Sequence, residues 1–336
     1  MNMKYAVIDQ YNTPKQGKNL GDYVQTIAAM QFLPKEPIFV DREGLNMYDG
    51  DKAKIIMASW FLKFPHNFPP SEKLAPLFVS SHFTKESINT FAKNADMYDY
   101  LKKYEPIGCR DTETEKGLKE IGIDAYFSGC LTLTLGNTIK RDFVSEEILF
   151  VDVMYNYRNW KGLLSYYSKA YRHFFGRIKK EKVRFLKEII QNASKKEKTL
   201  NKIFTKDLLA KGTFIAQLYI GNKNTNDREY HLQVAKEYLK RLSQAKLVVT
   251  SRIHCALPCL AIGTPVIFID SELDRERLSG LTDLFNTITI NEKGEICSNF
   301  EYPTKIGMNF IEEFANKNDY IKYKTELLNS VQDFLK

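Results

Sequence analysis

Residues 245–270, AKLVVTSRIHCALPCLAIGTPVIFID, constrain the fold of this chain more than any other stretch. The run LVV predicts a buried strand, TSR a short polar turn, the apolar residues that follow a helix, and VIFID a second buried strand. Two buried strands joined by a helix are the repeating unit of parallel sheets that carry helices on both faces. The chain is therefore predicted to be an α/β protein.

Strand-like runs recur along the chain and alternate with helix-like runs. Besides the unit above, they lie at residues 4–9, 38–40, 54–59, 77–81, 107–110, 125–127, 130–135, 148–154 and 214–220. Because 336 residues are more than one domain usually holds, we predict two doubly wound parallel-sheet domains that face a cleft. The first domain spans residues 1–145, the second spans 146–308, and a helix over 309–336 follows.

The positive charge of the chain is concentrated in residues 156–212. This segment holds 16 Lys and Arg against 4 Asp and Glu, whereas the whole chain has a net charge of +8. Aromatic residues are interleaved with the charges, so we predict a basic helical insertion in the second domain that contacts an anionic membrane surface or a diphosphate-linked lipid. A solvated helical hairpin is the alternative. The sequence has no recognised nucleic-acid motif, and nucleic acid is not a predicted partner.

The sequence also bears on compartment and on metals. No apolar run approaches the roughly 18 residues that a membrane span needs, and MNMKYAVIDQ leads into a strand-like run without a signal-peptide pattern. We expect a cytoplasmic protein, located at the inner face of the membrane if the basic segment binds there. The five cysteines form no CxxC pair, and Cys255 and Cys259 fit apolar core positions better than metal-ligand positions. No metal site is predicted.

The turn between the two strands of the opening unit holds the first candidate site residues. Ser251 lies where a helix begins, and free amides at a helix start favour an anion. Arg252 adds a forked donor suited to phosphate or carboxylate. His254 titrates near neutrality and can act as an acid or a base. The alternative is a capped helix followed by a partly buried histidine.

Three further segments place polar residues where a strand-like run ends. Arg110 ends the run at 107–110 and is a second candidate anion ligand. A surface pair of Arg110 with Asp111 is the alternative, and it is the favoured one for this segment alone. Asn19, Gly21 and Asp22 begin a predicted helix, where a glycine lets a ligand approach the backbone. A plain capped helix is the alternative. His82, after LFVSS, is a candidate ligand contact or a solvent-facing loop residue.

Taken together, these pieces resemble the polysaccharide pyruvyl transferase family. The resemblance rests on NLGD at residues 19–22, IGCRDTETEKGLKEIGI at 107–123, SGCLTLTL at 128–135 and AKLVVTSRIHCALPCLAIGTPVIFI at 245–269. Family members add a pyruvate ketal to a sugar, with phosphoenolpyruvate as the donor substrate and no further cofactor. Their fold resembles two-domain glycosyltransferases of the GT-B type. Where relatives often have a glycine pair after a central strand, this chain has Ala58-Ser59-Trp60.

The resemblance implies roles for individual residues. His254 is implied to be the general acid or base, and Arg252 and Arg110 to hold the phosphate and carboxylate of phosphoenolpyruvate. Asn19, Gly21 and Asp22 are implied to lie in the cleft. In the predicted mechanism, protonated His254 delivers a proton to the methylene carbon of the donor, and two sugar hydroxyls attack the neighbouring carbon in turn.

The predicted function is therefore pyruvyl transfer in the synthesis of capsular or other surface polysaccharide, on an acceptor that is linked to polyprenyl diphosphate. Two other functions fit the same residues. A GT-B-type glycosyltransferase that uses a nucleotide sugar would need a similar anion site. A non-catalytic protein that binds glycans or a lipid carrier could share the fold.

Overall fold

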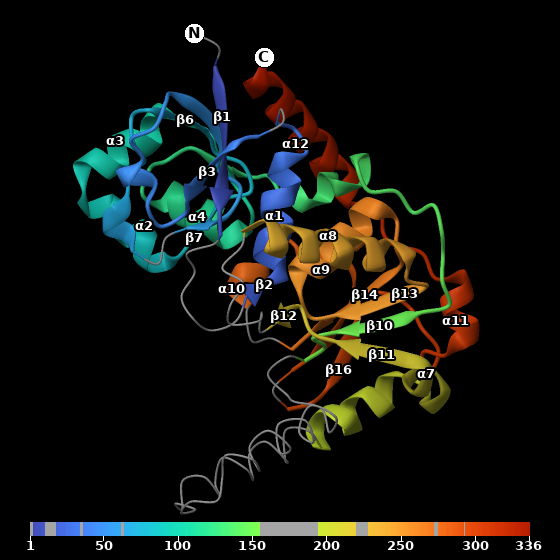
Figure 1. Cartoon of the computed structure of the whole chain (residues 1–336). Helices are drawn as coiled ribbons and strands as arrows, with labels where there is room; N and C mark the ends of the chain where they lie inside the picture. Colours follow the sequence, from blue (N-terminus) through green and yellow to red (C-terminus); the bar gives the residue numbers. More distant parts are fainter. Residues whose placement is uncertain are drawn as a thin grey trace, which may run out of the picture.

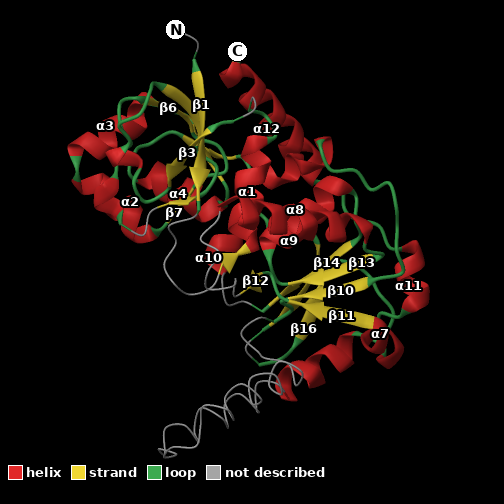
Figure 2. Ribbon diagram, in the orientation of Figure 1, coloured by secondary structure: helices red, strands yellow, loops and turns green. Residues whose placement is uncertain are grey.

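The computed structural model is a mixed α/β protein with two main sheets (Figures 1 and 2). The structure describes residues 3–10, 18–33, 36–61, 64–154, 194–219, 228–271, 275–291 and 293–336. In both sheets the central strands are apolar and buried on both faces, as parallel sheets covered by helices require.

The first sheet has the strand order β3-β1-β4-β6, and all neighbouring strands are parallel. Its strands are β1 (Lys4–Asp9), β3 (Ile38–Asp41), β4 (Ala53–Ile56) and β6 (Leu74–Leu77). The strand predicted at 77–81 therefore lies earlier in the chain than expected. The sequence pattern did not indicate a strand at β6 because it contains Pro76, and proline cannot donate a hydrogen bond to a neighbouring strand. Pro76 is tolerated because β6 lies at the edge of the sheet.

The second sheet contains the unit on which the sequence analysis opened. It has the order β11-β10-β13-β14-β15-β16, and only β16 is antiparallel to its neighbour. Helix α9 (Ile253–Ile262) connects β13 (Leu247–Thr250) to β14 (Val266–Asp270), which confirms the predicted strand-helix-strand unit. The other strands are β10 (Ile148–Val151), β11 (Gly212–Ile215), β15 (Asn286–Ile290) and β16 (Ile296–Ser298).

A layer of helices lies between the two sheets and shares one core with both (Figure 2). In β10, Leu149 and Val151 face this shared core, whereas Ile148 and Phe150 face a separate core beyond the sheet. The layer consists of α1 (Leu20–Met30), α8 (Arg228–Gln244), α9, α12 (Tyr320–Leu335) and the 3-10 helix η3 (Leu131–Asn137). A third core covers the opposite face of the first sheet, under α2 (Lys85–Lys93), α3 (Ala95–Lys103) and α4 (Thr112–Glu120).

The single helix predicted over 309–336 is wrong. The structure has two helices, α11 (Met308–Glu313) and α12, because Asn316 binds the second sheet between them. Its side chain accepts from Val266 N (2.9 Å) and donates to Thr264 O (2.8 Å). Helix α12 then returns to the first sheet, where Lys54 Nζ donates to Phe334 O (2.7 Å), so the C-terminal helix lies beside this sheet (Figure 1).

Most of the predicted basic insertion, residues 156–193, lies outside the described residues. Its last part is described and belongs to the core of the second sheet: residues 194–203 are helical, α7 spans Lys206–Lys211, and Phe204 and Leu208 are fully buried. Within the described ranges, no helix is long and apolar enough to cross a membrane.

Candidate active site

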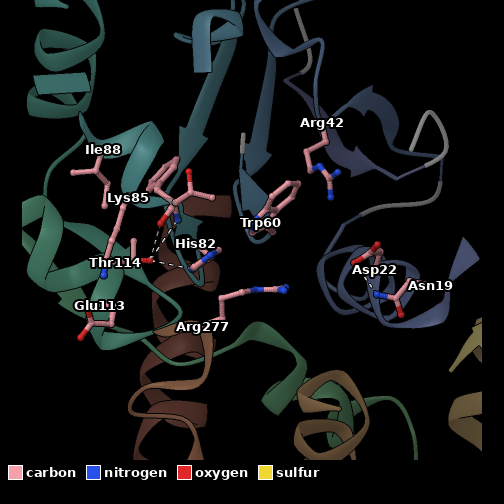
Figure 3. A pocket seen from close by; sticks show the side chains of 12 residues that line it. Asn19, Asp22, Arg42, Trp60, His82, Lys85, Ile88, Glu113, Thr114 and Arg277 are labelled. Atoms are coloured by element: carbon pink, nitrogen blue, oxygen red, sulfur yellow. Dashed lines mark hydrogen bonds between the residues drawn. The ribbon is translucent and has the colours of Figure 1, made fainter. Parts of the chain in front are cut away.

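Two adjoining chambers open where strands of both sheets end. The outer chamber has a volume of about 480 Å³ and the inner one about 70 Å³. Asn19, Asp22, Trp60 and Arg277 line both, so the chambers form one continuous site. Figure 3 shows the outer chamber, whose other lining residues are Arg42, His82, Phe83, Thr84, Lys85, Ile88, Glu113 and Thr114.

The inner chamber brings together residues that lie far apart in the sequence. Arg110 comes from the first half of the chain, Ser251 and Arg252 come from the turn before α9, and His254 comes from the first turn of α9. Together with Asn19 and Asp22, six of the eight predicted site residues therefore line one small chamber. The other two lie beside it: Gly21 backs His254, and His82 lines the outer chamber.

Two pairs of short strands align side chains along one wall. β5 (Trp60–Phe61) pairs in parallel with β7 (His82–Phe83), and β8 (Ile107–Cys109) pairs in parallel with β9 (Ala125–Phe127). His82 N donates to Ser59 O (3.0 Å), and Arg110 N donates to Ser81 O (2.9 Å). Trp60 and His82 consequently lie on adjacent strands, and Arg110, which directly follows β8, lies beside them at the same edge.

Arg110 is the most unusual side chain of the site. It is completely buried, and none of its three guanidinium nitrogens has a hydrogen-bond partner in the part of the chain that the structure describes. Asp111 Oδ2 is 3.9 Å from Arg110 Nε, and both side chains are inaccessible, so the alternative of a surface pair is wrong. Burial lowers the pKa of Arg110. A buried charge with unused donors is costly unless an anion binds it.

Arg252 is held by Asp152, a residue that the sequence analysis missed. Arg252 Nε donates to Asp152 Oδ2 (3.0 Å), and the same oxygen accepts from Gln217 N (3.1 Å). Asp152 directly follows β10 and has a φ of 44°, in the left-handed region. Its position after a buried strand was a usable signal, because functional side chains gather at the carboxyl ends of parallel strands.

Ser251 has a different position from the predicted cap. Its hydroxyl donates to Ile269 O (2.6 Å) and accepts from Met154 N (2.9 Å), so it ties the turn to neighbouring strands. Residue 252 is the N-cap of α9, and no described side chain caps this helix. The amides of its first turn, which line the inner chamber at Ile253 and His254, therefore add to the positive potential there.

His254 is surrounded by positive charge. Its side chain is nearly buried, and Nε2 has no hydrogen-bond partner among the described residues. Burial first, and then the charges of Arg110, Arg277 and Arg252, hold the pKa of His254 well below its ordinary value. His254 is therefore neutral at pH 7 before a donor binds, and the protonated form expected from the sequence requires a change in its surroundings.

The NLGD segment fixes the other side of the inner chamber. Asn19 Oδ1 accepts from Gly21 N (3.1 Å) and from Gln217 Nε2 (2.9 Å), so it caps α1 and links it to the second half of the chain. A Cβ atom at position 21 would lie 2.4 Å from Gln217 Nε2 and 3.0 Å from His254 Cβ, so a larger residue would push the Gln217 amide away from Asn19 and crowd His254. Burial raises the pKa of Asp22, although nearby arginines oppose this.

His82 and Asp111 form a buried pair on the wall of the outer chamber. His82 Nδ1 lies 2.6 Å from Asp111 Oδ2, while Asp111 Oδ1 accepts from Thr114 N (2.9 Å) and Thr114 Oγ1 (2.8 Å). Asp111 is thus the N-cap of α4 as well as the partner of His82. His82 is 5% exposed, which excludes the solvent-facing loop histidine that was the alternative.

The outer chamber contains further residues that the sequence analysis did not assign. The guanidinium carbon of Arg42 lies 4.8 Å from the centre of the Trp60 ring. Both residues follow strand-like runs. They could therefore have been predicted from the tendency of functional side chains to lie at the carboxyl ends of parallel strands. Arg277 lies on the short helix α10 (Arg275–Leu278), where no apolar pattern marks it. Cys255 and Cys259 are fully buried core residues of α9.

Comparison with known proteins agrees with the site. A comparison with curated proteins found no match. The family model described as polysaccharide pyruvyl transferase matches residues 19–272. This range begins at Asn19 and extends past β14, so it includes all eight predicted site residues. The chain therefore belongs to the polysaccharide pyruvyl transferase family and is a transferase with a role in polysaccharide synthesis.

Proposed function

We propose that the protein transfers the pyruvyl group of phosphoenolpyruvate to two hydroxyls of one sugar and forms a cyclic pyruvate ketal. Arg110 carries this assignment, because its buried guanidinium has three nitrogens without a described hydrogen-bond partner and lies next to Arg252 and His254. Phosphoenolpyruvate offers a carboxylate and a phosphate on a three-carbon frame, which suits a small chamber with several guanidinium groups. The outer chamber of about 480 Å³ then accommodates the sugar.

The wider proposal covers fold, acceptor and location. Two parallel sheets whose strand ends meet at one site fit a GT-B-like arrangement, with the domain boundaries predicted from the sequence. The acceptor is proposed to be a precursor of capsular or other surface polysaccharide linked to polyprenyl diphosphate. It would be reached at the cytoplasmic face of the membrane through residues 156–212, whose charge supports this contact.

Donor binding is proposed to activate His254. The anionic groups of phosphoenolpyruvate would neutralise the arginine charges that lower the pKa of His254, so the bound donor favours the imidazolium form. His254 then gives its proton to the methylene carbon, and the carbon that bears the phosphate becomes electron-poor. Arg110 and Arg252 stabilise the negative charge that develops on the departing phosphate.

Mass spectrometry of acceptors tests this function directly. The protein is incubated with phosphoenolpyruvate and a panel of free and polyprenyl-diphosphate-linked sugars, and products are examined for the added pyruvyl mass and for released phosphate. A parallel series replaces phosphoenolpyruvate with nucleotide sugars. Pyruvylated sugar formed only with phosphoenolpyruvate is the expected result. Glycosyl transfer from a nucleotide sugar, or no transfer from phosphoenolpyruvate to any acceptor, would contradict the proposal.

Replacing Asp152 with Asn is expected to weaken donor binding. The variant keeps an oxygen that can accept from Gln217 N but loses the charge that orients Arg252. A hydrogen bond to a charged group contributes about 1.5–3 kcal/mol, so KM for phosphoenolpyruvate should rise roughly 10- to 100-fold, with a smaller change in kcat. Steady-state kinetics measure both values. Asp142→Asn, at an exposed position, is the matched control and should change neither.

A further inference from the structure

We propose that the His82–Asp111 pair is a second proton-transfer group, which takes the proton of the sugar hydroxyl that attacks the donor. This inference rests on the proposed pyruvyl transfer and adds a catalytic residue to it. His254 faces the inner chamber, whereas His82 lines the larger chamber beside Arg277 (Figure 3).

The hydrogen bonds of Asp111 fix the tautomer of His82. Thr114 donates twice to Asp111 Oδ1, from its backbone N and its hydroxyl, and the bond from the backbone N makes Asp111 the N-cap of α4. Oδ2 lies 2.6 Å from His82 Nδ1, and an ionised carboxylate can only accept, so the ring carries its proton on Nδ1. Nε2 then holds a lone pair, and it has no hydrogen-bond partner among the described residues.

The charges around the pair favour a neutral base next to an ionised carboxylate. Burial first, then the charge of Arg110, lowers the pKa of His82, while the hydrogen bond and charge of Asp111 oppose this and Arg277 adds to it. Burial alone would raise the pKa of Asp111, but the contacts with His82, Arg110 and Thr114 hold it below its ordinary value. Asp111 can therefore stabilise the imidazolium that forms when His82 accepts a proton.

Ketal formation needs two such groups. His254 gives a proton to the methylene carbon, while the first hydroxyl oxygen bonds to the central carbon and its proton passes to His82 Nε2. The carbon–oxygen bond to phosphate then breaks, the electron pair leaves with phosphate, and His82 returns its proton to phosphate. The second hydroxyl bonds to the same carbon and gives its proton to the now neutral His254. Both histidines regain their starting states, and no oxidant or other reactant is consumed.

The outer chamber offers an acceptor sugar what this step requires. Trp60 pairs with His82 in the short parallel ribbon, and it lines both chambers. An aromatic side chain gives a sugar ring an apolar contact surface, and Asn19 and Asp22 line both chambers and can bind hydroxyls. A sugar in this chamber has His82 on its wall and the inner chamber beyond, so one hydroxyl can face both.

Kinetics of His82→Gln and Asp111→Asn test the assignment. His82→Gln should lower kcat about 100- to 10,000-fold, while the dissociation constant of phosphoenolpyruvate, measured by calorimetry, changes little. The acidic limb of the pH profile of kcat/KM should disappear in His82→Gln. Asp111→Asn retains an N-cap residue, and it should lower kcat and move the acidic limb to lower pH, because the carboxylate that favours imidazolium is gone. His66→Gln, at an exposed position, should leave both rate and profile unchanged.

Added imidazole provides a measurement that a purely structural role would not change. It should restore part of the activity of His82→Gly. If His82→Gln is not folded by circular dichroism, Asp111→Asn and the imidazole experiment decide the question. Provided that the wild type makes ketal, any one of three results overturns the inference. These are a normal kcat in His82→Gln, an unchanged acidic limb in Asp111→Asn, and no increase in the rate of folded His82→Gly when imidazole is added. If the wild type makes no ketal, the proposed function and this inference both fall.

Discussion

Replacing Arg110 with Met is expected to abolish most pyruvyl transfer and, at the same time, to make the folded protein more stable. The guanidinium is completely buried without a described hydrogen-bond partner, so folding loses its hydration and recovers little in return. Methionine has a similar length and no charge to desolvate. The free energy of unfolding should therefore rise by about 1–3 kcal/mol, the usual cost of a buried unsatisfied polar group.

The loss of activity has the same physical origin. A buried guanidinium whose hydrogen-bond donors are unused interacts strongly with an anion that reaches it, because little water screens the contact. Removing one partner of a buried charged pair costs about 2–5 kcal/mol, which corresponds to roughly 30- to several-thousand-fold in kcat/KM. Stability is measured by urea denaturation without ligand, and activity by release of phosphate from phosphoenolpyruvate in the presence of an acceptor.

Arg141→Met is the matched control. Arg141 Nη1 donates to Ser243 O (2.8 Å), Ala245 O (2.8 Å) and Thr264 Oγ1 (3.1 Å), and Arg141 does not line either chamber. Its replacement should lower the free energy of unfolding and leave kcat/KM nearly unchanged, the opposite of the Arg110 result. If Arg110→Met instead unfolds the protein as Arg141→Met does, Arg110 has a structural role and the anion site is wrong.

The strand-helix-strand unit was predictable because its signal is local. Buried parallel strands read as continuous apolar runs, and polar residues that follow them must lie at the carboxyl edge of a sheet. This reasoning located Arg110, Arg252 and His254, which come from different elements of the chain. It could not show that Arg110 lacks partners, because that depends on every side chain that packs around it.

The features that the sequence did not predict correctly depend on contacts between distant segments of the chain. The break between α11 and α12 follows from hydrogen bonds of Asn316 to the backbone near β14, and no helical periodicity reports them. Asp111 looked like a surface partner of Arg110, but the structure places it between His82 and Thr114. Arg277 lies on a helix of four residues, too short to show a pattern.

His254→Gln is expected to lower kcat about 100- to 10,000-fold, the usual contribution of a positioned acid or base, and to abolish proton uptake on donor binding. In the free protein the pKa of His254 lies well below its ordinary value, so the ring is neutral at pH 7. If phosphoenolpyruvate is the donor, as proposed, its anionic groups should raise this pKa by neutralising Arg110, Arg252 and Arg277. Between the free and the bound pKa, binding therefore takes up a proton, whereas glutamine cannot accept one.

Calorimetry in buffers with different ionisation enthalpies measures this uptake, and the wild type minus His254→Gln isolates the contribution of His254 from that of the donor's own phosphate. The pH dependence of stability provides an independent test of the lowered pKa of His254. As the pH falls below about 6.5, His254 binds a proton in the unfolded chain but stays neutral in the folded one. The free energy of unfolding of the ligand-free wild type should therefore fall more steeply with decreasing pH than that of His254→Gln. His231→Gln, a buried histidine outside both chambers, should bind the donor with normal proton uptake. Equal uptake in the wild type and His254→Gln would rule out His254 as the proton donor.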